Sequence, residues 1–261
     1  MRFCPLCSGS SGNSTYIEAG NERLLIDAGL SCRRIEELMQ SIGAAPEQLT
    51  GILITHEHID HSRGVNILSK KYGVPVYANA ECWSMMRAQM SGVLPDNVRV
   101  FESDRAFLLG GVSVLPFTTY HDSIHAVGFA VEHGGCKAAV CTDIGHIDER
   151  ILTTLSGCDL VLLEANHDVD MLMAGSYPYL LKKRILSGTG HLCNQDCANA
   201  LTALFERGVK RAILGHLSEE NNYPELALIT VRTALEAAGI ADKMPIDLAL
   251  RDRPTGIFEL P

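Results

Sequence analysis

The side chains best suited to chemistry lie in one short segment, Thr55-His56-Glu57-His58-Ile59-Asp60-His61. It follows the apolar residues of Gly51–Thr55, which we expect to form a buried strand. Imidazoles two positions apart on an extended loop can point at one metal ion, and Asp60 and His61 can then turn toward a second. Ligands in α/β proteins collect where a strand ends and a loop leads to a helix. A polar surface loop is the alternative, but with only 10 histidines in 261 residues such clustering by chance is improbable.

Further metal-binding side chains follow expected strands elsewhere in the chain. These are Asp27 at the end of Arg23–Asp27, His121 after Gly111–Phe117, Asp143 after Lys137–Thr142 and His216 after Lys210–Leu214. The loop His56-x-His58-x-Asp60-His61, followed in order by these residues, resembles the ligand pattern of the metallo-β-lactamase superfamily. The resemblance covers residues 14–217 and implies a four-layer αβ/βα sandwich with a dinuclear metal site at one edge.

The resemblance also implies a role for each side chain. One metal ion would be bound by His56, His58 and His121, a second by Asp60, His61 and His216, and Asp143 would bridge the two. Asp27 would support the histidine loop rather than bind metal, and Asp122 would either orient His121 or face solvent. Five histidines and two aspartates suit Zn²⁺, Mn²⁺ or Fe. Two divalent ions about 3.5–4 Å apart lower the pKa of a bound water and clamp both sides of a displacement, which is the chemistry of hydrolysis.

Two features bear on the bond that is hydrolysed. Asp143 stands where some antibiotic-hydrolysing members of the superfamily use Cys, which favours phosphodiesters, or thioesters as in glyoxalase-type members. Ser8–Ser14 is a Ser/Gly/Asn loop that can cradle an anion with its backbone N–H groups and with Ser10, Ser11 and Asn13, although a flexible hairpin connection has the same composition. With the later motifs, this loop resembles the YycJ/WalJ-like subgroup, whose members are described as exonuclease-like hydrolases.

Two further segments resemble nuclease motifs. Leu163-Glu164-Ala165-Asn166-His167-Asp168 is similar to the Glu-containing motif of RNase Z-type nucleases, and Gly188-Thr189-Gly190-His191-Leu192 to the Gly-His element that nuclease members place beside the scissile phosphate. We expect His191 to protonate the leaving oxygen, with Glu164 as its orienting partner. Asp60 completes the expected catalytic set, and Asn166 and His167 are expected to face the substrate. A loop histidine bonded to a carbonyl, and a surface acid at a strand end, are the structural alternatives for His191 and Glu164.

The hydrophobic pattern predicts the scaffold that positions these residues. Short apolar runs separated by Gly, Pro, Asn and Asp predict strands, and stretches with helical periodicity lie between them in both halves of the chain. The expected helices are Cys32–Ile42, Ser62–Tyr72, Ala80–Met90, Ile147–Leu155, Tyr179–Leu186, Asn194–Gly208 and Glu225–Ala238. No repeat or linker interrupts the pattern. We therefore expect an α/β fold in which residues 1–261 form a single domain.

The composition is that of an ordinary globular protein, with 46% hydrophobic and 20% charged residues. Asp and Glu outnumber Lys and Arg by 31 to 22, and the net charge of −9 excludes bulk attraction to nucleic acid or membranes. A polyanionic substrate must therefore meet bound metal or a local cationic site, for which Lys182–Arg184 is the best placed basic run. Nine irregularly spaced cysteines, no signal peptide and no long apolar span predict a reducing, cytoplasmic location, buried thiols and no membrane partner.

We therefore predict a dinuclear metal-dependent hydrolase, with two divalent ions as cofactors. The favoured activity is that of a phosphodiesterase or exonuclease on DNA ends, oligonucleotides or other nucleic-acid ends. A small-molecule hydrolase acting on a thioester, lactone or cyclic phosphodiester is the first alternative, and the net charge favours it slightly. A narrow, closed pocket would support it. A non-catalytic metal-binding regulator is the second alternative, and it requires a closed coordination sphere.

Overall fold

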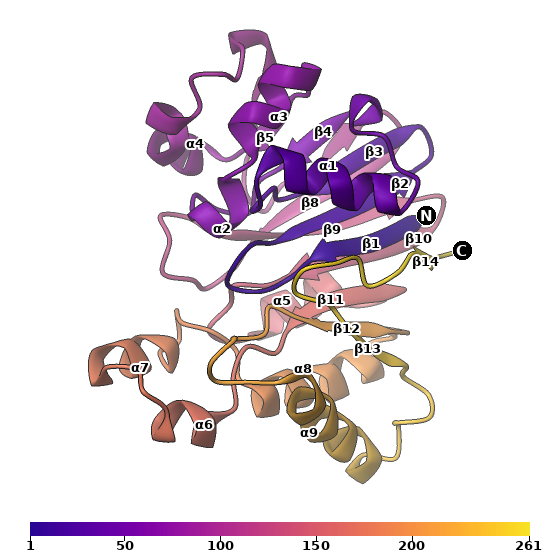
Figure 1. Cartoon of the computed structure of the whole chain (residues 1–261). Coiled ribbons are helices and arrows are strands. Elements are labelled where there is room, and N and C mark those ends of the chain that lie inside the picture. Colours follow the sequence, from indigo (N-terminus) through magenta and orange to yellow (C-terminus); the bar gives the residue numbers. More distant parts are fainter.

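Two seven-stranded sheets stacked face to face form the centre of the computed structural model, which describes residues 1–261 (Figure 1). The first sheet has the order β14 (Phe258–Glu259), β1 (Arg2–Cys7), β2 (Ser14–Ala19), β3 (Glu22–Ile26), β4 (Gly51–Leu53), β5 (Val76–Ala78) and β6 (Val98–Val100). The second has the order β13 (Ile246–Leu248), β12 (Ala212–Gly215), β11 (Leu160–Glu164), β10 (Cys136–Cys141), β9 (Val127–His133), β8 (Val112–Thr118) and β7 (Phe107–Leu109).

Each sheet is antiparallel on one side and parallel on the other. Strands β14 to β3 pair antiparallel and β3 to β6 parallel, while β7 to β10 pair antiparallel and β10 to β13 parallel. The parallel strand β11 is buried along its whole length, as its unbroken apolar run predicts. Because parallel strands point the same way, their carboxyl ends and the loops that follow share one edge of each sheet.

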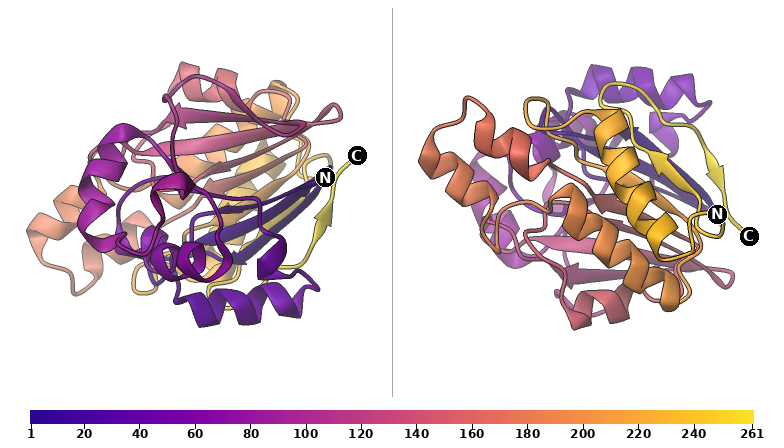
Figure 2. Two further views of the ribbon diagram at one scale, coloured as in Figure 1. Left: turned by 90° about the horizontal axis from the view of Figure 1, so that it is seen from above. Right: turned by 90° about the horizontal axis from the view of Figure 1, so that it is seen from below.

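Helices cover the outer faces of both sheets. The helices are α1 (Cys32–Ser41), α2 (Ile59–Ser62), α3 (Val65–Tyr72), α4 (Ala80–Met86), α5 (Glu149–Leu155), α6 (Val169–Ala174), α7 (Tyr179–Ile185), α8 (Asn194–Glu206) and α9 (Pro224–Ala237), with 3₁₀ turns at Pro46–Gln48, Arg87–Gln89 and Pro95–Asn97. One apolar core joins α1, α3 and α4 to the first sheet, another joins α5, α8 and α9 to the second, and a third fills the space between the sheets. The expected four-layer αβ/βα sandwich is confirmed (Figures 1 and 2).

The structure departs from the expected elements in a few places. The helix expected over Ser62–Tyr72 is α3, which begins only at Val65, and the short helix α2 precedes it. The two are separate because the N–H of Gly64 bonds outside the helix. The backbone N–H of Gly64 donates to the Ala28 carbonyl at 2.7 Å, and a Cβ at this position would collide with the Leu30 carbonyl oxygen. The short elements β7 and α6 lie in segments for which no strand or helix was expected. All nine cysteines are buried and free, and no helix is both long and apolar enough to cross a bilayer.

Helices α6 and α7 lie outside the four layers. They follow β11 and project from the body of the molecule as a pair, on the side where α2 also lies (Figures 1 and 2). No residue of α7 is buried, and Leu172 is the buried residue of α6. We call residues 169–186 the α6–α7 arm.

Candidate dinuclear metal centre

Asp27 holds the histidine loop at the end of β4. Its carboxylate accepts hydrogen bonds from the backbone N–H of Thr55 at 2.9 Å and from the Thr55 hydroxyl at 2.8 Å. His61 Nδ1 lies 2.8 Å from the same carboxylate, so this nitrogen donates and Nε2 faces the neighbouring ligands. The Thr55 hydroxyl also lies 3.0 Å from His56 Nδ1. Asp27 and Thr55 together therefore fix the orientation of two imidazoles.

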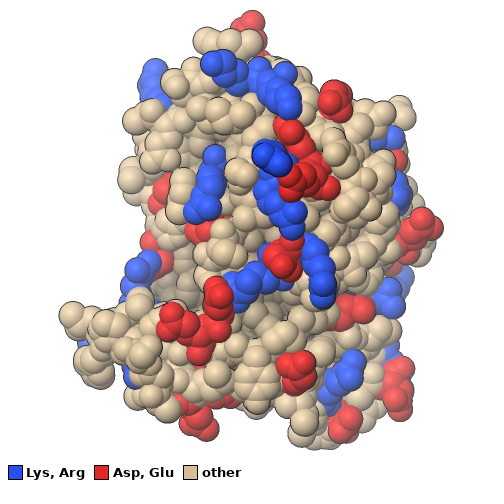
Figure 3. All heavy atoms as spheres, in the orientation of Figure 1, with Lys and Arg blue, Asp and Glu red and all other residues tan.

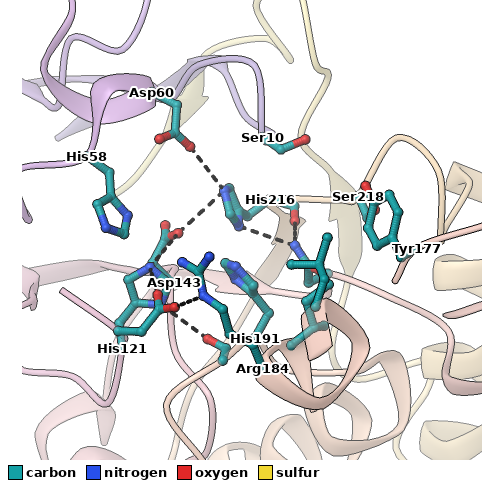
Figure 4. A pocket seen from close by; sticks show the side chains of 15 residues that line it. Ser10, His58, Asp60, His121, Asp143, Tyr177, Arg184, His191, His216 and Ser218 are labelled. Atoms are coloured by element: carbon teal, nitrogen blue, oxygen red, sulfur yellow. Dashed lines mark hydrogen bonds and ion pairs between the residues drawn. The ribbon is translucent and has the colours of Figure 1, made fainter. Parts of the chain in front are cut away.

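Side chains from both sheets converge at this edge (Figure 4). His56 and His58 of the loop form one group with His121, which follows β8, and their ligand atoms lie within 4.8 Å of one another. The second group, with the same spacing, is Asp60, His61 and His216. Asp143 stands between the groups, with its carboxylate oxygens 3.2 Å from His61 Nε2, 3.5 Å from His216 Nε2 and 3.7 Å from His121 Nε2. The arrangement is two adjacent donor sets that share one carboxylate.

The donors of this cluster fit a pair of divalent cations. His56 Nε2, Asp143 Oδ2 and His216 Nε2 are buried and have no hydrogen-bond partner in the protein. An unsatisfied buried polar atom costs about 1–3 kcal/mol, so its retention points to a partner outside the protein. Burial and the neighbouring His61 imidazole lower the pKa of His56 well below its usual value, which keeps its lone pair available for a metal ion. Imidazole nitrogens with carboxylate oxygens suit borderline divalent ions.

Three residues of the site have a left-handed backbone. The φ angles are 62° for Asp27, 56° for Asp143 and 55° for His216, and each residue comes within two positions of a strand end. This conformation costs a non-glycine residue about 1–3 kcal/mol and persists only where the surrounding structure imposes it. The chain thus bends sharply as it leaves β3, β10 and β12, and it holds these side chains at the sheet edge.

A single buried carboxylate links the metal donors to His191. Glu164, the last residue of β11, is fully buried, and its Oε1 accepts from His191 Nδ1 at 2.7 Å and from His216 Nδ1 at 2.8 Å. Its Oε2 accepts from the Ile144 backbone N–H at 2.7 Å. Burial opposes ionisation, but the two imidazoles outweigh it and lower the pKa of Glu164 to about 2. In turn, the carboxylate more than offsets burial and raises the pKa of His191 above its usual value.

The loop that carries His191 is packed against the ligands. His121 Nδ1 lies 3.1 Å from the Gly190 carbonyl, so its Nε2 faces Asp143. A Cβ at Gly190 would collide with the carbonyl oxygens of Arg184 and Ile185, and a Cβ at Gly145 would collide with the backbone of Gly188. Glycine is therefore required at 145 and 190, where backbones touch. These contacts make the ligands, the Gly190 turn and the base of α7 one packed unit.

An open pocket exposes the metal donors. It is lined by His58, Asp60, His121, Asp143, His191 and His216, together with Ser10, Asp122, Asn166, Tyr177, Leu181, Arg184, Ile185, Gly190 and Ser218. Figure 4 shows His58 and His121 on one side and Ser218 and Tyr177 on the other. Arg184 Nε pairs with Asp122 Oδ2, and Asp122 Oδ1 lies 3.3 Å from His121 Nε2.

Comparison with known proteins places this architecture in a family. Residues 22–217 match the sequence family described as the β-lactamase superfamily domain. The chain is 37% identical over 239 residues to exodeoxyribonuclease YycJ of Bacillus anthracis and 39% identical over 242 residues to exodeoxyribonuclease WalJ of Streptococcus pneumoniae. In both cases 92% of this chain and 90% of the relative are covered. The chain belongs to the metallo-β-lactamase superfamily. Its fold also matches the Bacillus subtilis metallo-β-lactamase fold protein YhfI, with a TM-score of 0.75 over 99% of each chain at 14% identity.

This metallo-β-lactamase superfamily hydrolase does not bring every expected substrate residue to the pocket. Ser10 reaches the pocket lining, and Ser11 is exposed beside it. Asn166 also lines the pocket, although its amide donates to the His216 carbonyl at 2.9 Å. Asn13 and His167 are buried and lie outside the lining. Asn13 bonds to Gly9 and lies 3.1 Å from His61 Nε2, so it closes the Ser8–Ser14 loop instead of facing substrate.

Several residues of the site, among them Thr55 and Tyr177, are not expected from the sequence. The apolar pattern predicts Thr55 only as the last residue of the strand before the histidine loop. In the structure, its hydroxyl connects Asp27 to the ring nitrogens of His56 and His61. Its place directly before the first ligand histidine was the available signal. Tyr177 lines the pocket from the α6–α7 arm, and no sequence motif indicated it.

Proposed function

We propose that the chain is a dinuclear metal-dependent exodeoxyribonuclease that hydrolyses phosphodiester bonds at DNA ends. The observation that carries this proposal is that two relatives aligned over 92% of the chain are named exodeoxyribonucleases. The adjacent donor groups of the site supply what a dinuclear hydrolase needs. The metal would be Zn²⁺ or Mn²⁺, with Fe²⁺ as a further candidate for the same donors. His56, His58 and His121 would hold one ion, and Asp60, His61 and His216 the other, with Asp143 shared.

When bound, the two ions would polarise the phosphate and supply a water nucleophile at neutral pH. The protein's own groups carry the rest of the reaction. His191 holds a proton on Nε2 and transfers it to the leaving oxygen, because Nδ1 is committed to Glu164 at 2.7 Å. Glu164 keeps both imidazoles in one tautomer through their Nδ1 atoms. Asp27 and Thr55 prevent the histidine loop from rotating when the phosphate is attacked.

The pocket lining favours a phosphodiester over a thioester or lactone. An acyl substrate calls for a mainly apolar pocket, whereas here only Tyr177, Leu181 and Ile185 of the lining residues are apolar or aromatic, and all three belong to the α6–α7 arm. The remaining surface carries charged or hydrogen-bonding groups. An accessible pocket in front of the donors also favours catalysis over a purely regulatory metal site, which would be closed.

The test is hydrolysis of a 5′-labelled single-stranded DNA beside bis(p-nitrophenyl) phosphate and a thioester, each with added Mn²⁺ or Zn²⁺. His58→Ala serves as the inactive variant. His133→Ala is the matched control, because His133 bonds to the Gly111 carbonyl on the surface and takes no part in the ligand groups. We expect loss of the full-length labelled DNA with the wild type and the control, and no loss with His58→Ala. Turnover of the thioester alone would contradict the proposal.

A further inference from the structure

The α6–α7 arm is built as a rigid extension of the metal centre. Lys182 Nζ donates to the carbonyls of Met173 and Gly175 at 2.7 Å each, which ties α7 to the end of α6. At the base of the arm, the His191 backbone N–H donates to the Ile185 carbonyl at 3.0 Å. Gly190 fits closely against the same turn. A molecule that contacts the arm is therefore held at a fixed position relative to His191 and the metal donors.

One face of the arm forms a wall of the pocket. Tyr177, Leu181, Arg184 and Ile185 all line it, and Arg184 is the only Lys or Arg that does so. Asp122 engages Arg184 through Nε alone, so both terminal guanidinium nitrogens have no acceptor in the protein. This geometry presents a cation on the pocket wall, next to Asp122 and in the same lining as the metal donors (Figure 4). Guanidinium groups bind phosphate oxygens through such paired N–H donors.

The rest of the arm carries exposed rings, apolar side chains and positive charge. Tyr179 is 73% exposed and Leu180 is 78% exposed. Residues 169–186 contain three cations, Lys182–Arg184, and one carboxylate, Asp170, in a chain whose net charge is −9. On the face seen in Figure 3, basic and acidic side chains are intermixed, and the surface is hollowed between the arm and the body. A local cationic arm with aromatic side chains is the combination that suits a nucleic-acid strand.

We propose that the α6–α7 arm binds one DNA strand at the point where the strand enters the metal centre. Arg184 binds the phosphate next to the scissile bond, and the Tyr177 ring stacks on the base of the adjoining nucleotide. This role rests on the proposed exodeoxyribonuclease function. It explains how an acidic protein binds a polyanion, since the phosphates meet the arm and the metal site and not a broad basic surface.

The experiment measures kcat and KM for the labelled DNA and for bis(p-nitrophenyl) phosphate, which has no base and no neighbouring phosphate. The variants are Arg184→Ala, Tyr177→Ala and Tyr177→Phe, with Arg33→Ala as the control because Arg33 is 88% exposed on α1 and pairs only with Glu37. We expect the kcat/KM ratio of DNA to the small substrate to fall about tenfold in both alanine variants, which for Tyr177 lies within the roughly 5- to 150-fold contribution of one stacked base. Tyr177→Phe should restore the ratio, because it keeps the ring.

A second readout separates a phosphate contact from a merely structural role. Arg184→Ala should reduce the slope of log KM for DNA against log salt by about one, as expected when one phosphate contact is lost. Equal losses on both substrates with an unchanged slope would mean that Arg184 only holds Asp122, and would overturn its assignment. An unchanged ratio in both alanine variants would overturn the role of the arm while the nuclease activity stood. A wild type that cleaves bis(p-nitrophenyl) phosphate but not DNA would instead overturn the proposed function and this role with it.

Discussion

Replacing Glu164 by Gln tests whether one carboxylate orients both the metal donors and the proton donor. Glu164→Gln keeps the shape of the side chain, but the three groups that donate to the carboxylate, Ile144 N–H, His191 Nδ1 and His216 Nδ1, cannot all find an acceptor on an amide. If the amide oxygen faces the two imidazoles, the NH₂ group meets the Ile144 N–H, and if the amide is flipped, it meets two Nδ1–H groups. At least one hydrogen bond to a charged group is lost and one buried donor is left unsatisfied. The lost bond costs about 1.5–3 kcal/mol and the unsatisfied donor about 1–3 kcal/mol, so the free energy of unfolding should fall by about 3 kcal/mol.

The same change should reduce catalysis and shift its pH dependence. Without the carboxylate, His191 is no longer held in one orientation, and kcat should fall about 100-fold, the lower part of the range for a general acid. The carboxylate also raises the pKa of His191. Its removal should lower this pKa, so that the loss of activity with rising pH begins at a lower pH than in the wild type. Urea denaturation measures the first effect, and kcat against pH the second. A variant with wild-type kcat and an unshifted alkaline limb would refute the assignment of His191 as the acid and of Glu164 as its partner.

Three further predictions concern the frame of the site. His58→Ala should lower the bound metal from two ions per chain to one and reduce turnover by more than about 100-fold, which metal analysis and the DNA assay check; full metal content with full activity would exclude His58 as a ligand. Thr55→Val removes the hydroxyl that joins Asp27 to two imidazoles and should lower metal affinity about 10–100-fold, measured by competition with a chelating dye. Gly190→Ala forces a Cβ into two carbonyl groups and should cost about 1–3 kcal/mol of stability, whereas Gly111→Ala, whose Cβ meets only the edge of His133, should stay within about 0.5 kcal/mol.

The sequence predicted the features that depend on residue type and local order. The histidine loop, the strand-end positions of Asp143 and His216, and the alternation of strands and helices all follow from local patterns, and the four-layer fold follows from the family resemblance. Contacts between distant segments were not accessible. Thr55 forms part of the site only because the fold brings it into contact with Asp27, which is 28 positions away in the sequence. Likewise, Asn13 and His167 have the residue types of substrate contacts, but packing buries them behind the pocket.

The break at Gly64 shows the same limit in secondary structure. Residues 62–72 have the periodicity of one helix, and nothing in that pattern reveals that the Leu30 carbonyl passes where a Cβ would lie. The arm illustrates the opposite case. Tyr177 carries no motif at all, and its position at the pocket depends on how the pair of short helices is anchored at Gly190.

The division of the proposed ligands between the two sheets would determine when during synthesis the chain can bind metal. The first sheet supplies the four proposed ligands of residues 56–61, and the second supplies the proposed ligands His121, Asp143 and His216. A nascent chain that ends before His216 lacks part of one donor set, so full affinity arises only after most of the chain has been made and the two sheets have docked. Each bound ion then stabilises the docked state by mass action, by about 2.7 kcal/mol at a free concentration 100 times its Kd. On the proposed ligand assignment, metal uptake would therefore be a late event that follows the docking of the two sheets.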